Sequence, residues 1–278
     1  IIMFTGCNSN NYSITTCKRD PMISFANKSE VMVTYTVFVY HKDGFVEKTE
    51  AVQEDVLKNA KYRENGCVKV YGKVVLVVGA SSGIGKAIAE TLAMDGYKVY
   101  GTSRKYQDDL KTIPETNSDK GFIKMLCLDV CSEECINKAV VDVEQKEGKV
   151  DILVNCAGFG IAGSVEDTSD EEAFRQFNTN FFGAHRICRS VIPIMRKQGH
   201  GLIINISSVA GLITVPFQSF YSASKCAMEA LMEGLRMELK PFGIKVVLIE
   251  PGDTQTGFTN NRVFVRASED SIYKEVFN

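Results

Sequence analysis

Short apolar runs alternate with amphipathic segments along most of the chain, beginning at Gly72. The run KVVLVVG at 73–79 is almost continuous in valine and leucine and ends in glycine, which is typical of a strand buried on both faces. The next segment, GKAIAETLAMDG, places Ile88, Ala89 and Leu92 at helical spacing. This alternation continues to residue 252 and predicts six βα repeats, which fold into a doubly wound parallel sheet with right-handed crossovers.

The remaining strands and helices follow from the same two patterns. Strands are predicted at 97–103, 121–130, 150–158, 201–208 and 244–252. Helices are predicted at 85–96, 132–148, about 169–197 and 219–243. Ser132, which two acidic residues follow, is expected to cap the second of these helices. The predicted fold class is therefore α/β with a Rossmann-type sheet.

Residues 1–71 do not show this alternation of apolar strands and amphipathic helices. Their opening is polar and rich in Asn, Ser and Thr, and the stretch 31–50 predicts two strands joined by a turn at Lys42-Asp43-Gly44. We therefore divide the chain into an N-terminal segment at 1–71 and a Rossmann-type domain at 72–278. The role of the N-terminal segment stays open between a small β-unit, an oligomer contact and a regulatory or partner-binding element.

Composition narrows the classes of function. The chain has 278 residues, is 45% hydrophobic and 24% charged, and carries a formal net charge of −2, which is typical of a globular protein and gives no reason to expect a nucleic-acid partner. No apolar run approaches the roughly 18 residues of a membrane span. The start of the chain lacks the charged region and cleavage pattern of a signal peptide.

The nine cysteines are odd in number and scattered, so we expect reduced thiols and a cytoplasmic location. Cys127, Cys131 and Cys135 are spaced four residues apart, which raises the question of a metal site. Cys127 falls on a predicted strand and no CxxC or nearby His completes a tetrahedral set. We therefore expect structural thiols and no metal.

A glycine-rich turn separates the first strand from the first helix. Gly79, Gly83 and Gly85 form the pattern GxxxGxG. Glycine suits such a turn because it tolerates unusual backbone angles and lets the backbone approach a pyrophosphate closely. A helix that starts near Ile84 would direct its free N–H groups and positive dipole end toward the anion. At the start of six βα repeats, this turn predicts a dinucleotide site.

A second group of polar residues lies at 207–225. Tyr221 and Lys225 share one face of a predicted helix, one turn apart, and Ser208 ends a predicted strand thirteen positions before Tyr221. Tyrosine is a weak acid with a pKa near 10, and a neighbouring cation lowers that pKa. Alone, a Tyr–Lys pair at this spacing is an ordinary structural feature. Combined with the glycine turn, it predicts acid–base chemistry beside a dinucleotide.

With these motifs in place, the chain resembles a classical short-chain dehydrogenase/reductase. The matching pieces are GASSGIG at 79–85, Asp129, NCAG at 155–158, Asn180 within NTNFFG, Ser208, YSASK at 221–225 and PGDTQT at 251–256. The stretch from 221 to 246 is most similar to hydroxysteroid and retinol dehydrogenase-like members. Two departures stand out. Val78 replaces the usual Thr, and the chain stops at Asn278 where relatives continue, so an incomplete C-terminal pocket wall is expected.

The resemblance implies a set of site residues. The catalytic residues it implies are Asn180, Ser208, Tyr221 and Lys225. The cofactor-binding residues it implies are Gly79, Ser81, Ser82, Gly83, Ile84, Gly85, Ser103, Arg104, Lys105, Asp129, Val130, Asn155, Ala157, Gly158, Tyr221, Lys225, Pro251, Gly252, Thr254 and Thr256. Asp129 would bind the adenine amino group, although a turn or cap acid before Ser132 is the simpler alternative.

The residues at the end of the second strand predict which nicotinamide cofactor binds, because members of the family contact the adenosine ribose there. Ser103 is followed by Arg104 and Lys105 where an acidic residue would select NAD(H). The arginine fork suits a 2′-phosphate, so NADP(H) is expected. The resemblance then implies a reductase or dehydrogenase that interconverts a small-molecule ketone or aldehyde and an alcohol, with Tyr221 as general acid/base.

The resemblance also implies a homodimer or homotetramer formed through the helices at about 170–196 and 218–241. Two other functions remain open. One is a 3-oxoacyl-carrier-protein reductase, and the other is a catalytically silent nucleotide-binding sensor or scaffold.

Overall fold

The computed structural model describes four strands before residue 53 and most of the chain from residue 72 onward. The described residues are 2–5, 13–16, 34–40, 46–52, 72–104, 121–252, 254, 256, 258, 262–265 and 271–277. The turn expected at 42–44 and the cofactor candidate Lys105 lie outside them.

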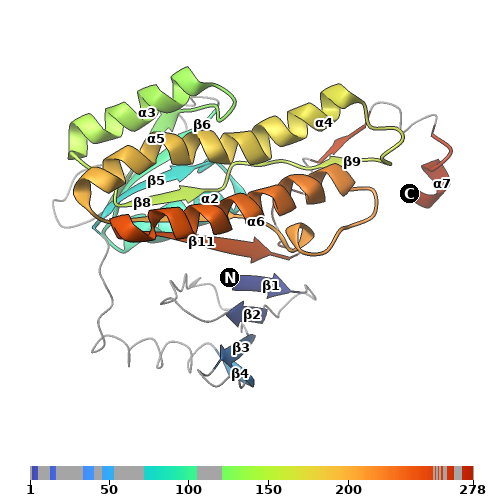
Figure 1. The fold of residues 1–278 in the computed structure, drawn as a ribbon, viewed down its shortest axis with the longest axis horizontal. Coiled ribbons are helices and arrows are strands. Elements are labelled where there is room, and N and C mark those ends of the chain that lie inside the picture. Colours follow the sequence, from blue (N-terminus) through green and yellow to red (C-terminus); the bar gives the residue numbers. More distant parts are fainter. Residues whose placement is uncertain are drawn as a thin grey trace.

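Six parallel strands form the centre of the molecule, as predicted (Figure 1). In spatial order they are β11 (Ile244–Pro251), β10 (Gly201–Ile206), β8 (Ile152–Asn155), β5 (Val74–Val78), β6 (Lys98–Ser103) and β7 (Phe122–Cys127). The chain order reverses between β5 and β8, which pair with each other. In open α/β sheets, ligands bind at such a switch point, beyond the carboxyl ends of the strands.

Helices cover both faces of this sheet and enclose two apolar cores (Figure 1). The helices are α2 (Gly83–Met94), α3 (Glu133–Glu147), α4 (Asp170–Phe177), α5 (Gly183–Gln198), α6 (Ser219–Leu239) and the short α7 (Lys274–Phe277). Apolar side chains of α3, α5 and α6 share one core, and those of α2 lie in the other. The Ser132 cap is confirmed, because Cys135 N donates to the Ser132 hydroxyl at 3.2 Å.

The region predicted as one mostly helical stretch at about 169–197 changes its winding in the middle. A π-helical segment, Asn178–Phe182, separates α4 from α5. Each peptide there is wound more widely than in an α-helix, and such segments occur often at functional sites. Apolar periodicity does not reveal this change, because the segment is one turn long.

The N-terminal strands include two that the sequence did not indicate. β1 (Ile2–Thr5) pairs in parallel with the edge strand β11, and β2 (Ser13–Thr16) pairs with β1 in antiparallel orientation. Isoleucine and threonine favour extended backbone, and β11 offers a free edge. β3 (Thr34–Tyr40) and β4 (Val46–Val52) form a separate antiparallel pair where two strands were expected.

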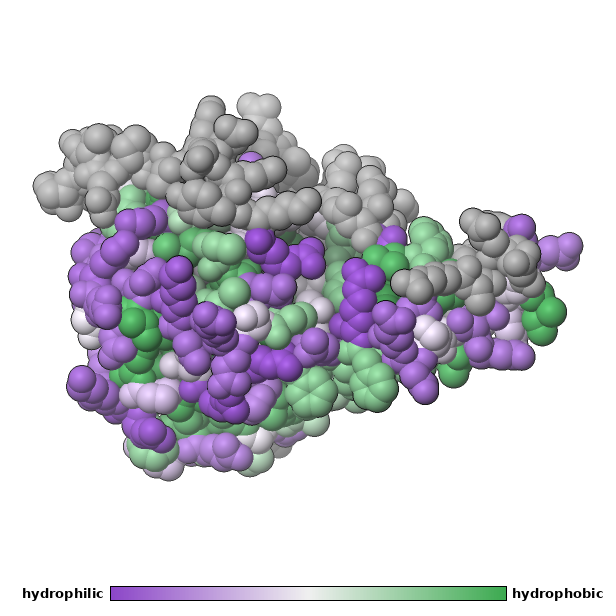
Figure 2. All heavy atoms as spheres, turned by 90° about the horizontal axis from the view of Figure 1, so that it is seen from above, coloured by the Kyte–Doolittle hydropathy of each residue, from purple (hydrophilic) through white to green (hydrophobic). Residues whose placement is uncertain are grey.

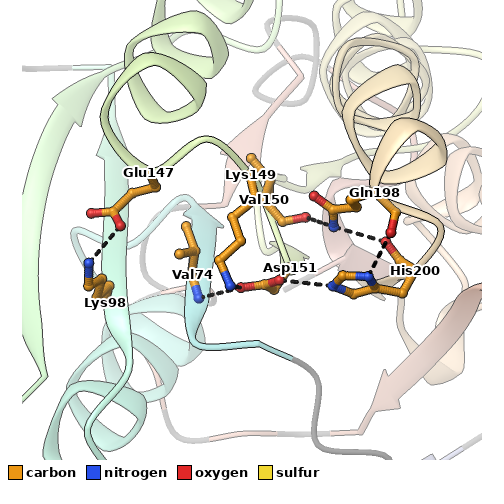
Figure 3. Close-up of polar contacts among 8 residues, drawn as sticks. All are labelled: Val74, Lys98, Glu147, Lys149, Val150, Asp151, Gln198 and His200. Atoms are coloured by element: carbon orange, nitrogen blue, oxygen red, sulfur yellow. Dashed lines mark hydrogen bonds and ion pairs between the residues drawn. The ribbon is translucent and has the colours of Figure 1, made fainter.

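A buried carboxylate lies at the amino ends of the central strands (Figure 3). Asp151 has no exposed surface, and its Oδ2 accepts a hydrogen bond of 2.9 Å from the amide N of Val74. Lys149 Nζ lies 3.0 Å from Oδ2, and His200 Nε2 lies 3.1 Å from Oδ1. This cluster joins β5, β8 and the turn before β10.

Hydrophilic side chains cover most of the described surface seen from above, with small apolar groups between them (Figure 2). Among the described helices, none combines the length and apolar character needed to cross a membrane.

Candidate active site

The turn between β5 and α2 has the backbone that only glycine adopts easily. Gly79 has φ +82° and Gly83 has φ +54°. A side chain at Gly85 would overlap the carbonyl oxygen of Gly79. Two of the three glycines are therefore required by conformation and the third by close approach.

The amino end of α2 leaves room and hydrogen-bond donors for an anion. Ser82 is the N-cap residue, but its side chain makes no cap hydrogen bond, and the first turn contains no acid. A Cβ on Gly83 would lie 3.6 Å from the side chain of Thr256. The glycine turn and the segment after β11 thus form two sides of a cradle suited to a pyrophosphate.

Thr102 supplies a hydroxyl that the sequence seemed to lack. Val78 replaces the threonine usual in the family, but Gly79 N lies 3.4 Å from Oγ1 of Thr102 on the neighbouring strand β6. Ala80 N also donates to the Thr102 carbonyl at 2.9 Å. Thr102 is fully buried. Sequence analysis missed it because the contact joins two strands that are distant in sequence.

Ser208, Tyr221 and Lys225 meet beyond the carboxyl end of β10. Ser208 ends the loop from β10 and hydrogen-bonds to Tyr221 on α6. Lys225 Nζ lies 5.9 Å from the centroid of the Tyr221 ring and donates to the Ile206 carbonyl at 2.8 Å. Both α6 side chains are buried, with 7% of Tyr221 and 5% of Lys225 exposed.

The protonation of Tyr221 differs from the sequence prediction. Burial raises its pKa, while the hydrogen bond from Ser208 and the positive charge of Arg262 oppose that rise without cancelling it. The net shift of the Tyr221 pKa is therefore upward, and Lys225 is not among the groups that determine it in this structure. Burial lowers the pKa of Lys225 itself to about 8.

Asn180 lies in the π-helical segment and reaches the same place. Its side chain exchanges two hydrogen bonds with the main chain of Phe159, and its Nδ2 also donates to Ser224 Oγ at 3.1 Å. A Cβ on Gly158 would lie 3.3 Å from Asn180 Oδ1 and 3.7 Å from Lys225 Nζ. The missing side chain of Gly158 is therefore what allows Asn180 and Lys225 to face one space.

Gln176 is a further positioning residue that the sequence did not indicate. Its side chain is fully buried, accepts from Ile161 N at 2.8 Å and donates to the Phe159 carbonyl at 2.8 Å. It thereby fixes the loop after β8. The bonds are tertiary, and an isolated glutamine on a helix gives no pattern that would predict them.

The other predicted cofactor residues follow the carboxyl ends of the strands. Asp129 Oδ1 accepts from Cys131 N at 2.8 Å, which is the turn role of the simpler alternative. Asn155 Nδ2 donates to Asn205 Oδ1 at 2.9 Å and joins β8 to β10. Thr254 Oγ1 donates to the Gly252 carbonyl at 3.2 Å, and Arg104 is exposed at the end of β6. The rest are Ser81 and Ile84 after β5, Ser103 on β6, Val130 after β7, Ala157 after β8 and Pro251 on β11.

The chain after β11 folds back over Tyr221. The ring of Phe258 lies 5.6 Å from the ring of Tyr221, centroid to centroid. β12 (Val263–Phe264) pairs in parallel with β9 (Ile161–Ala162). In Figure 1, β9 and α7 lie at the end of the molecule toward which β8 and β11 point. Described residues after β11 thus lie against Tyr221 and against the segment after β8.

These features fit a nicotinamide dinucleotide. The cradle at the turn accepts a pyrophosphate, and the buried Tyr221, Ser208 and Lys225 stand where an adjoining reactive ring and its substrate would meet. The bound cofactor would be held by the turn at 79–85, by the strand ends, and by Lys225 and Thr256.

Comparison with known proteins identifies the class of enzyme. Residues 73–264 match the family model described as short chain dehydrogenase. The chain is an oxidoreductase and belongs to the short-chain dehydrogenase/reductase family. It is 45% identical over 190 residues to the 3-ketodihydrosphingosine reductase of Bacteroides thetaiotaomicron, which covers 68% of this chain and 67% of that protein. It is 40% identical to retinol dehydrogenase 8 of Bos taurus, over 67% of this chain and 60% of that protein.

Solved structures agree with this assignment. A short-chain dehydrogenase from Streptomyces avermitilis has a TM-score of 0.62 and 40% identity, over 69% of this chain and 70% of that one. A short chain dehydrogenase/reductase from Burkholderia phymatum, solved in complex with NAD, has a TM-score of 0.62 and 29% identity, over 68% of this chain and 69% of that one.

Proposed function

We propose that this chain is an NADP(H)-dependent oxidoreductase that interconverts a ketone or aldehyde and the corresponding alcohol. The observation that carries the proposal is the meeting of Tyr221, Ser208 and Lys225 in a buried space next to the glycine turn. Each group has the chemistry that carbonyl reduction requires, and no described neighbour neutralises the Lys225 amine with a direct ion pair.

The proposed reaction assigns one role to each side chain. The reduced nicotinamide supplies the hydride when it is bound. Negative charge then develops on the carbonyl oxygen, and the Tyr221 hydroxyl transfers its proton to that oxygen. Ser208 donates a hydrogen bond to the same oxygen and orients it. Lys225 places its positive charge beside the phenolate that remains on Tyr221, and Asn180 is placed to orient a water that passes a proton to Lys225.

Tyr221 is in the protonated form that this direction of reaction requires. Its pKa lies above the ordinary value near 10, so at neutral pH the hydroxyl holds the proton that it donates. Cellular NADPH would favour reduction as well. Alcohol oxidation would use the same groups in reverse, with Tyr221 as base.

The residues at the end of β6 support the proposed preference for NADP(H) over NAD(H). Arg104 is exposed there, directly after Ser103, and no acidic residue occupies either position. A guanidinium binds a 2′-phosphate through two parallel hydrogen bonds. Arg104→Ala is expected to weaken NADPH binding more than NADH binding.

The substrate class follows from the relatives and from the pocket wall. The Phe258 ring lies against the Tyr221 ring, so aromatic surface borders the reacting group. The named compounds of the relatives, 3-ketodihydrosphingosine and retinol, are therefore the first to test here, the latter as retinal with NADPH.

The decisive experiment follows NADPH consumption with a panel of ketones and aldehydes, repeated with NADH and with Tyr221→Phe. We expect consumption with NADPH and a loss of at least about a hundredfold in Tyr221→Phe, because the proton donor is gone. Tyr97→Phe, at the amino end of β6, is the matched control and should keep full activity. Binding of NADPH without turnover of any carbonyl would instead support a nucleotide sensor.

Oligomeric state, location and domain limits are also proposed. We place the catalytic domain at 72–278, with residues 1–71 as an N-terminal segment whose strand β1 pairs with the edge of the domain's sheet, and expect a homodimer or homotetramer through the helices at about 170–196 and 218–241. The six described cysteines are all free, which supports a reducing, cytoplasmic location. Light scattering on a sizing column tests the oligomer directly.

A further inference from the structure

Arg262 adjoins the loop beside Tyr221 through its neighbour Val263 but has no part in the chemistry described so far. It directly precedes β12, whose Val263 N donates to the Gly160 carbonyl at 2.9 Å. A Cβ on Gly160 would lie 3.2 Å from Phe258 and 3.7 Å from Tyr221. The backbone around Arg262 is therefore held against the loop that borders Tyr221.

Described residues on either side of Arg262 along the chain also contact the segments around the site. Ser271 donates to Asp167 and the Tyr273 hydroxyl donates to Glu166 at 2.8 Å, which ties these residues to the segment after β9. Phe258 packs on the ring of Tyr221. Through Val263, Arg262 itself adjoins the loop that holds Gly160.

The guanidinium of Arg262 has unused binding capacity. Its Nε is buried and has no hydrogen-bond acceptor among the described residues. A buried donor without a partner is costly, and native proteins usually provide one. The charge also acts on Tyr221, where it favours the phenolate, so the guanidinium lies within electrostatic reach of the reacting oxygen.

These observations indicate what the missing partner is. A guanidinium binds carboxylates and other oxygen acceptors through charge-assisted hydrogen bonds and repels ammonium groups. The apolar remainder of a substrate would lie along Phe258 and its neighbours. A substrate with an acceptor oxygen a few bonds from its carbonyl would reach both Tyr221 and Arg262.

We propose that Arg262 is a specificity-determining residue that binds an anionic oxygen group, such as a carboxylate, close to the reacting carbonyl of the substrate. This inference rests on the proposed carbonyl reductase function and names the substrate class of the same site. The enzyme then prefers 3-oxo acids to simple ketones of equal chain length.

The test compares two probes that differ only in the anionic group, 3-oxodecanoate and nonan-2-one, which carries the same heptyl chain on its carbonyl. With Arg262→Gln, kcat/KM for 3-oxodecanoate should fall about 10–100-fold more than kcat/KM for nonan-2-one, because the acid loses a charge-assisted hydrogen bond while both probes share the loss of the charge that acts on Tyr221. Arg262→Lys should restore part of the loss, because it keeps the charge without the fork. Arg236→Gln, on the exposed side of α6, is the matched control.

A binding measurement separates this inference from the proposed function. Calorimetry should show that 3-hydroxydecanoate binds to the NADP⁺-loaded protein at least about tenfold more weakly in Arg262→Gln than in the original protein. Arg262-dependent binding without turnover of either probe would overturn the reductase function and keep the inference. Equal losses for both probes, or no loss for either, would overturn the inference and leave the reductase function standing.

Discussion

Replacing Asp151 by Ala is expected to destabilise the protein strongly without altering the cofactor site. The Asp151 carboxylate is fully buried and accepts from Val74 N, while Lys149 and His200 contact its two oxygens (Figure 3). Removal would leave the buried Val74 N–H unsatisfied, which costs about 1–3 kcal/mol. Loss of the charged contacts adds less, because Lys149 and His200 are partly exposed and can be hydrated. The free energy of unfolding should therefore fall by about 2–4 kcal/mol.

Asp151→Asn separates the hydrogen bond from the charge. Its amide oxygen still accepts from Val74 N, so it should lose only about 1–2 kcal/mol. Burial would raise the pKa of Asp151, but the Val74 N–H, Lys149 and His200 outweigh burial and hold that pKa below its usual value. The contribution of the ionised carboxylate is therefore present above about pH 4 and is lost as the pH falls through the lowered pKa.

The assay is urea denaturation at pH 7, followed by melting curves at several pH values from pH 7 down to about pH 2, which spans the range where the contribution is lost. Asp142→Asn, on α3, is the control and should change the free energy of unfolding by less than about 0.5 kcal/mol. The affinity of the folded variants for NADPH should be unchanged, because Asp151 lies at the opposite end of β8 from the glycine turn. An Asp151→Ala protein as stable as the original at pH 7 would refute the reasoning.

Three further predictions concern the site and its surroundings. In Gly85→Ala, the added methyl group would overlap the Gly79 carbonyl. The NADPH dissociation constant should therefore rise at least about tenfold, and the free energy of unfolding should fall by about 1–3 kcal/mol. Titration of NADPH fluorescence measures the first effect and urea unfolding measures the second. Thr102→Val removes the acceptor for Gly79 N and should weaken NADPH binding by a few-fold, at about 1 kcal/mol, while kcat stays nearly constant in steady-state kinetics. Burial first, and then the neighbouring Glu229, raise the pKa of Glu250 to about 7. The native state therefore keeps a proton that the unfolded chain loses above about pH 4.3, so this group's contribution to stability falls as the pH rises toward 7. Glu250→Gln should flatten that part of the pH–stability curve, and an unchanged slope would contradict the assignment.

The regular part of the fold was predictable because its signals are local. The valine run of β5 is apolar at every position, and Ser132 precedes its helix with an acidic first turn, so both features are visible within a few residues. The glycine turn was equally visible in the sequence, because its three glycines are spaced as GxxxGxG. Gly79 and Gly83 adopt positive φ values in the structure. Each of these depends on neighbours in the chain and not on distant contacts.

The features that escaped prediction depend on tertiary contacts. Thr102 replaces the hydroxyl missing at Val78 from a neighbouring strand, and Gln176 fixes a loop through two main-chain bonds. The pKa of Tyr221 was predicted from its spacing to Lys225 alone. In the folded protein, burial dominates, and the cation that acts on the Tyr221 pKa is Arg262, forty-one positions later in the chain.

The pairing of β9 with β12 has a consequence for how this enzyme can diverge. Main-chain bonds from Val263 N to Gly160 O and from Val265 N to Ala162 O hold the wall of the pocket, and neither bond involves a side chain. Exposed side chains on this strand can therefore be exchanged while the backbone that presents them stays in place. Substitutions at the exposed Phe264 are therefore expected to change the surface chemistry of this strand while the β9–β12 pairing stays in place.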